Sequence, residues 1–219
     1  MAALLVIVAA GSGTRLGRQE PKALVPLAGR PILSWTLEAF APAGFSRTVV
    51  TAPPDRLAEF ERLAGGRARV VAGGETRSAS VRRGFEALGA GDDDVVAVHD
   101  AARPFLTADE IRAVLSAAEK TGAAIAATPV VDTIKRTAAG RILETVERAD
   151  LYGAATPQAF RASVLRRALA TGQEATDEAA LCERLGLPVE VVPVSRFSFK
   201  ITTPEDLELA EAIARGRQG

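Results

Sequence analysis

Short runs of apolar, largely β-branched residues recur along the chain and are separated by segments with a different spacing. The runs lie at 4–9, 48–51, 69–72, 94–98, 123–127 and 189–194. Between most of them apolar residues return at helical spacing, as in Ile32, Leu33, Leu37 and Phe40. Continuous apolar strands that alternate with helices are typical of a mostly parallel sheet covered on both faces. We therefore predict a single Rossmann-like α/β domain over residues 1–219.

The pattern changes near residue 128. Apolar and polar residues alternate over 128–137 and again over 141–148, on either side of the turn Ala138-Ala139-Gly140, and helical spacing resumes at 161–170. This predicts a β-hairpin arm over 130–150 that protrudes from the sheet. An isolated two-stranded hairpin is marginal in water, and a two-fold partner is the commonest cover. We therefore expect the arm to be used for dimerisation in a homodimer.

Composition narrows the class of protein. The 27 basic and 27 acidic residues balance, which gives no support for a general affinity for nucleic acid or membrane. A single cysteine, Cys182, and a single histidine, His99, exclude a disulfide framework within the chain and a metal site rich in cysteine or histidine. The apolar N-terminal run has no basic segment before it and indicates a buried strand rather than a signal peptide, so we expect a cytoplasmic protein.

The first predicted strand leads into a glycine-rich loop. This loop contains Ala9, Ala10, Gly11 and Gly13, together with Arg15, and Lys22 follows shortly after. Loop N–H groups after a strand can cradle phosphates, and two cations would add to that attraction. Only four of the 27 basic residues are lysines, so a lysine here indicates a need for a compact ammonium group. The loop predicts a phosphate or nucleotide site; the alternative is a tight turn with two solvated basic residues.

Two familiar phosphate motifs do not fit this loop. The dinucleotide fingerprint requires a third glycine where Leu16 stands and an acidic residue at the end of the next strand, which here ends in Val50-Thr51-Ala52. The Gly-Lys-Ser/Thr of a P-loop is also absent. A nicotinamide reductase or a P-loop kinase is therefore a minor alternative.

Two further loops follow strands at the same predicted edge of the sheet. In the first, Gly74 and Ser80 offer backbone and hydroxyl groups that could contact a base, while Thr76 or Ser78 could instead cap a helix. In the second, Asp100 ends a strand, where a carboxylate is costly to bury unless it binds a cation. We expect Asp100 to hold Mg²⁺ between phosphates and Arg103 to bind a second anionic group. The alternative is a structural Asp100–Arg103 pair, and His99 is expected to orient this loop.

At this point the ordered motifs resemble a known family. The segment Ala9-Ala-Gly-Ser-Gly-Thr-Arg-Leu16 followed by Pro21-Lys22 is similar to the signature of nucleotidyltransferases that act on sugar phosphates. The resemblance is narrowed by His99-Asp-Ala-Ala-Arg-Pro104, Asp132-Thr-Ile-Lys135, Thr145-Val-Glu-Arg148, Thr156-Pro-Gln158, Thr176-Asp-Glu178 and Lys200-Ile-Thr-Thr-Pro-Glu-Asp-Leu207. Together these motifs resemble the 2-C-methyl-D-erythritol 4-phosphate cytidylyltransferase family over residues 4 to about 213.

The resemblance implies a reaction and a set of residue roles. The reaction is the transfer of CMP from CTP to methylerythritol phosphate in non-mevalonate isoprenoid biosynthesis, with release of pyrophosphate and with Mg²⁺ as cofactor. The implied catalytic cations are Arg15, Lys22 and Lys200. The nucleotide site would comprise Ala9, Ala10, Gly11, Gly13, Gly74 and Ser80. The acceptor site would comprise Asp100, Arg103, Thr133, Arg148 and Thr156, together with Lys200.

The family's hairpin crosses to the partner subunit, so each active site would borrow Arg148 from its neighbour. One departure is visible, since the chain has Ser198-Phe199-Lys200 where family members often have Asn-Ile-Lys. Two rivals remain open at this point. A ribitol 5-phosphate cytidylyltransferase shares much of the pattern, and a non-catalytic nucleotide-binding regulator belongs to another class of protein.

Overall fold

A seven-stranded sheet forms the centre of the protein, which we describe from a computed structural model. The structure describes residues 1–11, 13, 16–17 and 20–218. The strand order is β11 (Glu190–Pro193), β7 (Ala123–Pro129), β10 (Tyr152–Arg161), β6 (Val95–Asp100), β1 (Ala3–Val8), β4 (Arg47–Ala52) and β5 (Arg69–Ala72). Only β10 runs antiparallel to its neighbours within this sheet. The predicted mostly parallel sheet is therefore confirmed.

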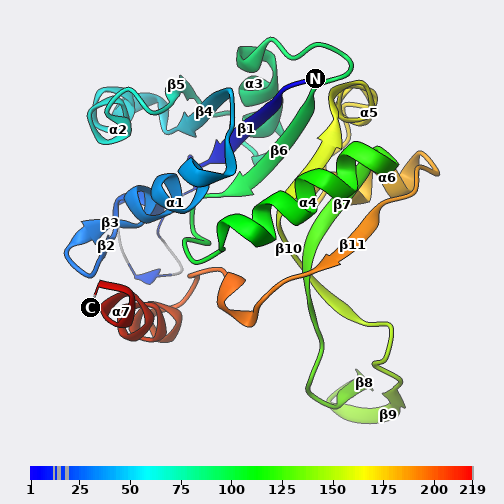
Figure 1. Cartoon of the computed structure of the whole chain (residues 1–219). Helices are drawn as coiled ribbons and strands as arrows, with labels where there is room; N and C mark the ends of the chain where they lie inside the picture. The colour runs from blue at the N-terminus through cyan, green and yellow to red at the C-terminus, as the bar shows by residue number, and fades with distance from the viewer. Residues whose placement is uncertain (12, 14–15, 18–19, 219) are drawn as a thin grey trace.

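Helices cover both faces of this sheet, as Figure 1 shows. One face packs against α1 (Ile32–Phe40), α2 (Leu57–Ala64) and α4 (Ala108–Thr121). The other packs against α3 (Arg77–Leu88), α5 (Ala162–Leu169) and α6 (Glu178–Arg184). The two apolar cores explain why the inner strands are continuous apolar runs, since their side chains are buried on both faces.

The C-terminal helix belongs to a third apolar cluster beside the sheet. Helix α7 (Pro204–Gln218) packs against the small ribbon of β2 (Pro26–Leu27) and β3 (Arg30–Pro31), and Trp35 of α1 joins the same cluster. Short 3₁₀ turns complete the connections, at η2 (Lys22–Leu24), η3 (Ala41–Ala43), η4 (Pro54–Arg56) and η5 (Arg196–Ser198). No helix in the described ranges is long and apolar enough to span a bilayer.

Strand β10 is the element that sequence periodicity missed. Its residues Tyr152–Arg161 include glycine, three alanines and a proline, which are poor strand formers. The strand nevertheless forms, because it pairs with β6 on one side and β7 on the other. Pairing on both sides outweighs weak local propensity, and it places Thr156 and Gln158 in the middle of the sheet.

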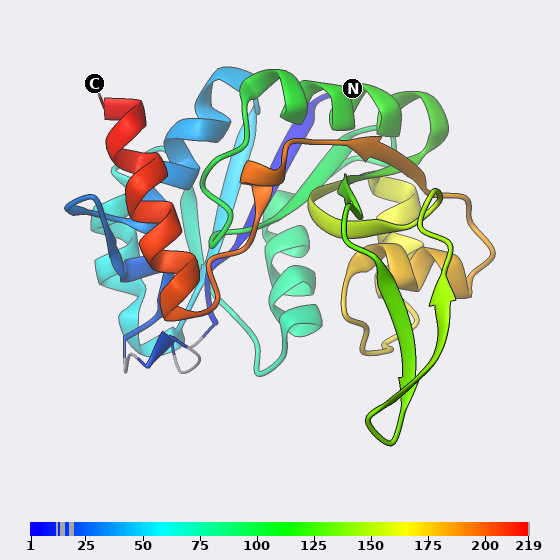
Figure 2. The same cartoon turned by 90° about the horizontal axis from the view of Figure 1, so that it is seen from below.

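The predicted hairpin is present and stands away from the main sheet. Its strands β8 (Ile134–Ala138) and β9 (Arg141–Val146) form a separate antiparallel ribbon. Figures 1 and 2 both show it projecting from the body of the protein. Ile142 and Leu143 are 65% and 63% exposed, which is high for large apolar side chains. The use of this arm in dimerisation stays a prediction.

Candidate active site

A cavity of about 480 Å³ lies where several parallel strands end. The carboxyl ends of β1 and β6 and the loop after β5 meet at this edge of the sheet, where α/β folds bind ligands. The sequence-predicted residues that line the cavity are Ala9, Ala10, Gly11, Lys22, Gly74, Ser80, Asp100 and Lys200. Residues more than 190 positions apart in the chain are thus brought to one site.

The glycine loop and the loop before α3 form one wall of this cavity. Ala9 donates its backbone N–H to Thr51 O at 2.9 Å, and Gly73 donates to Ala52 O at 2.8 Å, so both loops are held against the end of β4. A Cβ at Gly73 would collide with the side chain of Ala10, which is why the two backbones can approach so closely. Ala10 and Gly11 of the first loop and Gly74 of the second line the cavity.

The hydroxyl of Ser80 is used within the second loop. It accepts from Gly74 N–H at 3.0 Å and donates to Thr76 O at 2.9 Å. Thr76 caps α3 by accepting from Ala79 N–H at 3.1 Å, so the capping alternative is confirmed for Thr76. Contact between Ser80 and a base is compatible with this arrangement and stays a prediction.

Of the two cations predicted in and after the glycine loop, Lys22 and Arg15, the structure describes only Lys22. Lys22 opens η2, is 8% exposed and lines the cavity, and its backbone N–H donates to Gly11 O at 3.3 Å. Arg15 lies outside the described residues. Gly13 is described and buried, but it is not among the residues that line the cavity. The backbone of Lys22 is thus joined to the glycine loop, and the role of Lys22 as a catalytic cation stays a prediction.

Asp100 is the centre of a charged cluster in the same cavity. Its Oδ1 lies 3.2 Å from Nε of Arg77, and its Oδ2 accepts from Nζ of Lys200 at 2.7 Å. Burial alone would raise the pKa of Asp100, but the charges of Arg77 and Lys200 outweigh it and hold that pKa well below its ordinary value. Asp100 is therefore an anion that is already compensated by protein cations.

Arg103 is next to this cluster but is only loosely paired with Asp100. Its Nε lies 4.0 Å from Asp100 Oδ2, beyond hydrogen-bond distance, and its Nη1 donates to Ser198 O at 2.8 Å. The alternative of a structural Asp100–Arg103 pair is therefore present only as a long ion pair, while Asp100 has closer contacts with Arg77 and Lys200. Nε of Arg103 is buried and has no hydrogen-bond partner within the described part of the chain. Arg103 is not among the residues that line the cavity, and its binding of an anionic group stays a prediction.

Two charged residues of the cluster, Arg77 and Glu178, were not assigned a role from the sequence, although Glu178 ends the motif Thr176-Asp-Glu178. Arg77 donates from Nη1 to both carboxylate oxygens of Glu178, at 2.8 and 3.0 Å. Glu178 is 1% exposed, and burial raises its pKa while the contact with Arg77 opposes that rise. One signal was available: an arginine in the first turn of a predicted helix opposes the helix dipole unless carboxylates compensate it. The identity of those carboxylates is not visible in the local sequence.

His99 and Thr156 fix the backbone beneath Asp100. Nε2 of His99 lies 3.1 Å from Arg103 O, and because a carbonyl only accepts, this nitrogen carries the proton. Nδ1 then accepts from the Thr156 hydroxyl at 2.9 Å, and the same hydroxyl accepts from Asp100 N–H at 3.1 Å. Burial lowers the pKa of His99 to about 3, so the ring is neutral. This arrangement agrees with an orienting role for His99 and gives Thr156 a structural contact to Asp100.

The two predicted hairpin residues lie elsewhere. Thr133 and Arg148 are exposed and do not line the cavity of their own chain. The Arg148 guanidinium donates to Val131 O within the arm. Within one chain, therefore, the cavity is lined by eight of the predicted residues of the body. Gly13, Arg103 and Thr156 do not line it, and neither do the two residues of the arm.

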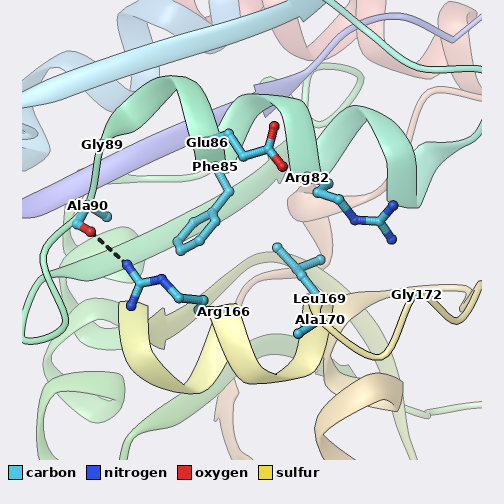
Figure 3. Close-up of a pocket in the computed structure, with 9 residues that line it drawn as sticks. All are labelled: Arg82, Phe85, Glu86, Gly89, Ala90, Arg166, Leu169, Ala170 and Gly172. Carbon is cyan, nitrogen blue, oxygen red and sulfur yellow. Dashed lines mark hydrogen bonds between the residues drawn. The ribbon is translucent and has the colours of Figure 1, made fainter.

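A larger cavity of about 640 Å³ lies between α3 and α5 (Figure 3). As Figure 3 shows, Phe85 of α3 and Leu169 of α5 line it, and none of the predicted site residues does. Arg166 lies over the Phe85 ring at 5.5 Å and donates to Ala90 O at 2.8 Å. The smaller cavity is the candidate active site, because it combines the glycine loop after β1 and the loop before α3 with clustered charges.

Comparison with known proteins decides the family. The family model described as "IspD: 2-C-methyl-D-erythritol 4-phosphate cytidylyltransferase" matches residues 3–216. The chain belongs to the IspD family. A relative from Deinococcus radiodurans with that enzyme name is 47% identical, over 95% of this chain and 88% of its own. Another, from Prochlorococcus marinus, is 45% identical over 95% of this chain and 96% of its own.

A solved IspD-family structure agrees with the fold. The crystal structure of 2-C-methyl-D-erythritol 4-phosphate cytidylyltransferase from Thermus thermophilus superposes with a TM-score of 0.81 at 38% identity. The match covers 98% of this chain and 100% of that one. The resemblance inferred from ordered motifs is therefore confirmed at the level of family and fold.

Proposed function

We propose that this chain transfers CMP from CTP to 2-C-methyl-D-erythritol 4-phosphate and releases pyrophosphate. The observation that carries the proposal is a single cavity, in a member of the IspD family, that joins a glycine loop with Lys22 to a charged cluster at Asp100 and Lys200. A regulator that only bound a nucleotide would not need both of these. The ribitol 5-phosphate alternative is not favoured, because the family model and the relatives compared carry the methylerythritol name.

The residues support a direct displacement without a covalent enzyme intermediate. A phosphate oxygen of the acceptor is already an anion, so it can attack the α-phosphorus of CTP without a strong base. The new P–O bond forms as the bond to pyrophosphate breaks, and pyrophosphate leaves with the electron pair. The main barrier is the approach of two polyanions, which Arg15, Lys22 and Lys200 lower by fixed positive charge.

A magnesium ion is part of the proposal. Mg²⁺ prefers phosphate, carboxylate and water oxygens and commonly takes only one or two protein ligands. The described residues contain no group of three acidic, histidine or cysteine side chains suited to a resident metal. Asp100 lines the cavity, but both its oxygens already contact cations. An ion that arrives with the triphosphate and is held mainly by phosphate oxygens would fit this cavity. Asp100 would ligate it only by giving up a contact with Arg77 or Lys200.

Pyrophosphate release from CTP with each candidate acceptor tests the function directly. We expect turnover with methylerythritol phosphate, dependence on Mg²⁺, and much poorer use of ATP, GTP or UTP. Lys22→Ala should lower kcat by about 10²–10³, the usual cost of one transition-state donor, with the fold unchanged by circular dichroism. Lys120→Ala is a matched control on the exposed end of α4. Near wild-type kcat in Lys22→Ala would reject the role of Lys22, and better turnover with ribitol phosphate would reject the acceptor.

The proposal includes a homodimer in which Arg148 completes the partner's site. Two observations support this: the arm exposes the apolar side chains of Ile142 and Leu143, and Arg148 does not line the cavity of its own chain. Lys22→Ala and Arg148→Ala chains, each inactive alone, are mixed and allowed to exchange subunits. Random pairing makes half the dimers mixed, and each mixed dimer holds one complete site, so about a quarter of wild-type site activity should return. No recovery despite confirmed exchange would show that Arg148 does not act across the dimer.

A further inference from the structure

The charged cluster contains a residue whose position local structure alone does not favour. Arg77 is the first residue of α3, and the first turn of that helix contains no acidic residue. The N-terminus of a helix carries partial positive charge, so a guanidinium there is unfavourable unless carboxylates from elsewhere compensate it. Its two compensating carboxylates come from β6 and α6, 23 and 101 positions away in the sequence.

Glu178 holds one side of the Arg77 guanidinium through two hydrogen bonds to one nitrogen. Its own backbone is fixed, because Glu178 N–H donates to Oε1 of the buried Gln158 at 3.1 Å. Gln158 also donates to Asp177 Oδ2 at 3.0 Å, which pins the start of α6 to β10. Glu178 is therefore a rigid anchor rather than a mobile counter-ion.

The same strand supports Asp100. Thr156 of β10 accepts from the Asp100 N–H, so Asp100 and Glu178 are both positioned relative to β10. Arg77 spans the two carboxylates, and it takes only Oδ1 of Asp100. Oδ2 is thereby left to Lys200, which contacts it from the other side of the carboxylate group.

Charge balance does not require Arg77 at Asp100. Lys200 forms a hydrogen bond to Asp100, and Arg103 lies 4.0 Å away, so two other cations already face this carboxylate. The contribution of Arg77 is to fix the orientation of the Asp100 carboxylate. Without it, Asp100 can turn both oxygens toward Lys200 and Arg103 and draw those cations away from an incoming phosphate.

We infer that Arg77, anchored by Glu178, is a positioning residue that orients Asp100 and so keeps Lys200 in place on the acceptor side of the cavity. This inference rests on the proposed function. It assigns Glu178 a role through Arg77, and it predicts that the two act as one unit. A misplacement of about 1 Å in a reacting group can cost about 10²-fold in rate, which sets the expected size of the effect.

Steady-state kinetics with both substrates tests the role. Arg77→Gln should lower kcat/KM for methylerythritol phosphate by about 10²-fold, while KM for CTP changes less than about threefold. Arg77→Lys should restore little, because a compact ammonium cannot bind both Glu178 oxygens and Asp100 at once. Arg82→Gln is the matched control, since Arg82 is on the same helix and has no ion-pair or hydrogen-bond partner among the described residues.

The double variant separates positioning from stability. Arg77→Gln leaves Glu178 buried and unpaired, so its melting temperature should fall by about 10 °C. Adding Glu178→Gln removes that charge, and most of the melting temperature should return. The acceptor kcat/KM should stay low, equal to that of Arg77→Gln alone, because Glu178 acts only through Arg77.

Each other outcome overturns the inference. If the double variant recovers kcat/KM for the acceptor as well as melting temperature, the Arg77–Glu178 pair has only a structural role. An equal rise in KM for CTP would make Arg77 a nucleotide-binding residue, and full restoration by lysine would reduce its role to charge. Wild type and Arg82→Gln must both release pyrophosphate with CTP and methylerythritol phosphate; if neither does, it is the proposed function that fails.

Discussion

The Asp100 cluster buries charged side chains, whereas the β8–β9 hairpin exposes large apolar ones. In the cluster, charged groups are buried, with side-chain exposure of 11% for Asp100, 1% for Glu178 and 24% for Arg77, and they compensate one another within the chain. In the hairpin, Ile142 and Leu143 are large apolar groups that no described residue covers. The charges of the cluster are compensated within one chain, whereas the apolar side chains of the hairpin are left exposed in it.

The largest expected effect is the loss of the central charge of the cluster. Asp100→Asn leaves Arg77, Arg103 and Lys200 facing a neutral group, and breaking a buried pair costs about 3–5 kcal/mol of unfolding free energy. The measurement is urea denaturation near pH 7. Activity should fall as well, since Lys200 loses its partner.

The matched control for this variant is Asp92→Asn. Asp92 pairs with Arg166, but its side chain is 73% exposed and that of Arg166 is 45% exposed. An exposed pair contributes at most about 1 kcal/mol, so the loss should be small. If both substitutions cost the same, burial is not what distinguishes the cluster from surface ion pairs.

An intermediate effect should appear in acid, at the histidine beneath the cluster. His99 is fully buried and its pKa is lowered to about 3. Below pH 6.5 the unfolded chain binds a proton that the folded protein excludes, so unfolding free energy falls as pH falls from 6.5 toward about 3. The slope approaches about 1.4 kcal/mol per pH unit.

Denaturation of wild type and His99→Gln between about pH 7 and about pH 5.5 isolates this contribution. Glutamine keeps a donor for Arg103 O but does not titrate, so the difference in stability between the two proteins should shrink as pH falls. A difference that is constant across this range would show that His99 protonates with little cost in the folded protein.

The smallest effect on folding is expected in the hairpin, where the change should appear in assembly. Replacing Ile142 and Leu143 by serine should alter unfolding free energy of the monomer by about 0.5 kcal/mol or less, because both are exposed. If the arm forms the dimer, its affinity should fall at least about tenfold, since burial of one such side chain is worth about 1.5–3 kcal/mol. Sedimentation over a range of concentrations measures this.

Val191→Ser supplies the control for the hairpin. Val191 is 42% exposed on the edge strand β11, so the variant loses a similar apolar group from a different surface. Its dimer affinity should equal that of wild type. If both variants lower the dimer affinity equally, or if neither lowers it, the hairpin is not the interface.

Local sequence determined the elements with a strong period of their own. The apolar runs that became β1, β4, β5, β6, β7 and β11 were predictable as strands from their composition. The runs of the inner strands β1, β4, β6 and β7 are continuous because these strands are largely buried on both faces. The hairpin was predictable from alternation, and the cavity from loops after parallel strands, since those strands end at one edge. Lys22 and Asp100 were predictable members of one site for the same reason, because each lies in a loop or at a strand end on that edge.

Tertiary structure alone decided the features that depend on distant partners. Strand β10 forms despite its glycine and alanines because it is paired on both sides, and pairing partners are invisible to local periodicity. The bond between Arg77 and Glu178 joins residues 101 positions apart, and that between Lys200 and Asp100 spans 100. A charged residue at a position that the sequence predicts to be buried needs a compensating partner. Only the folded chain determines which residue that partner is.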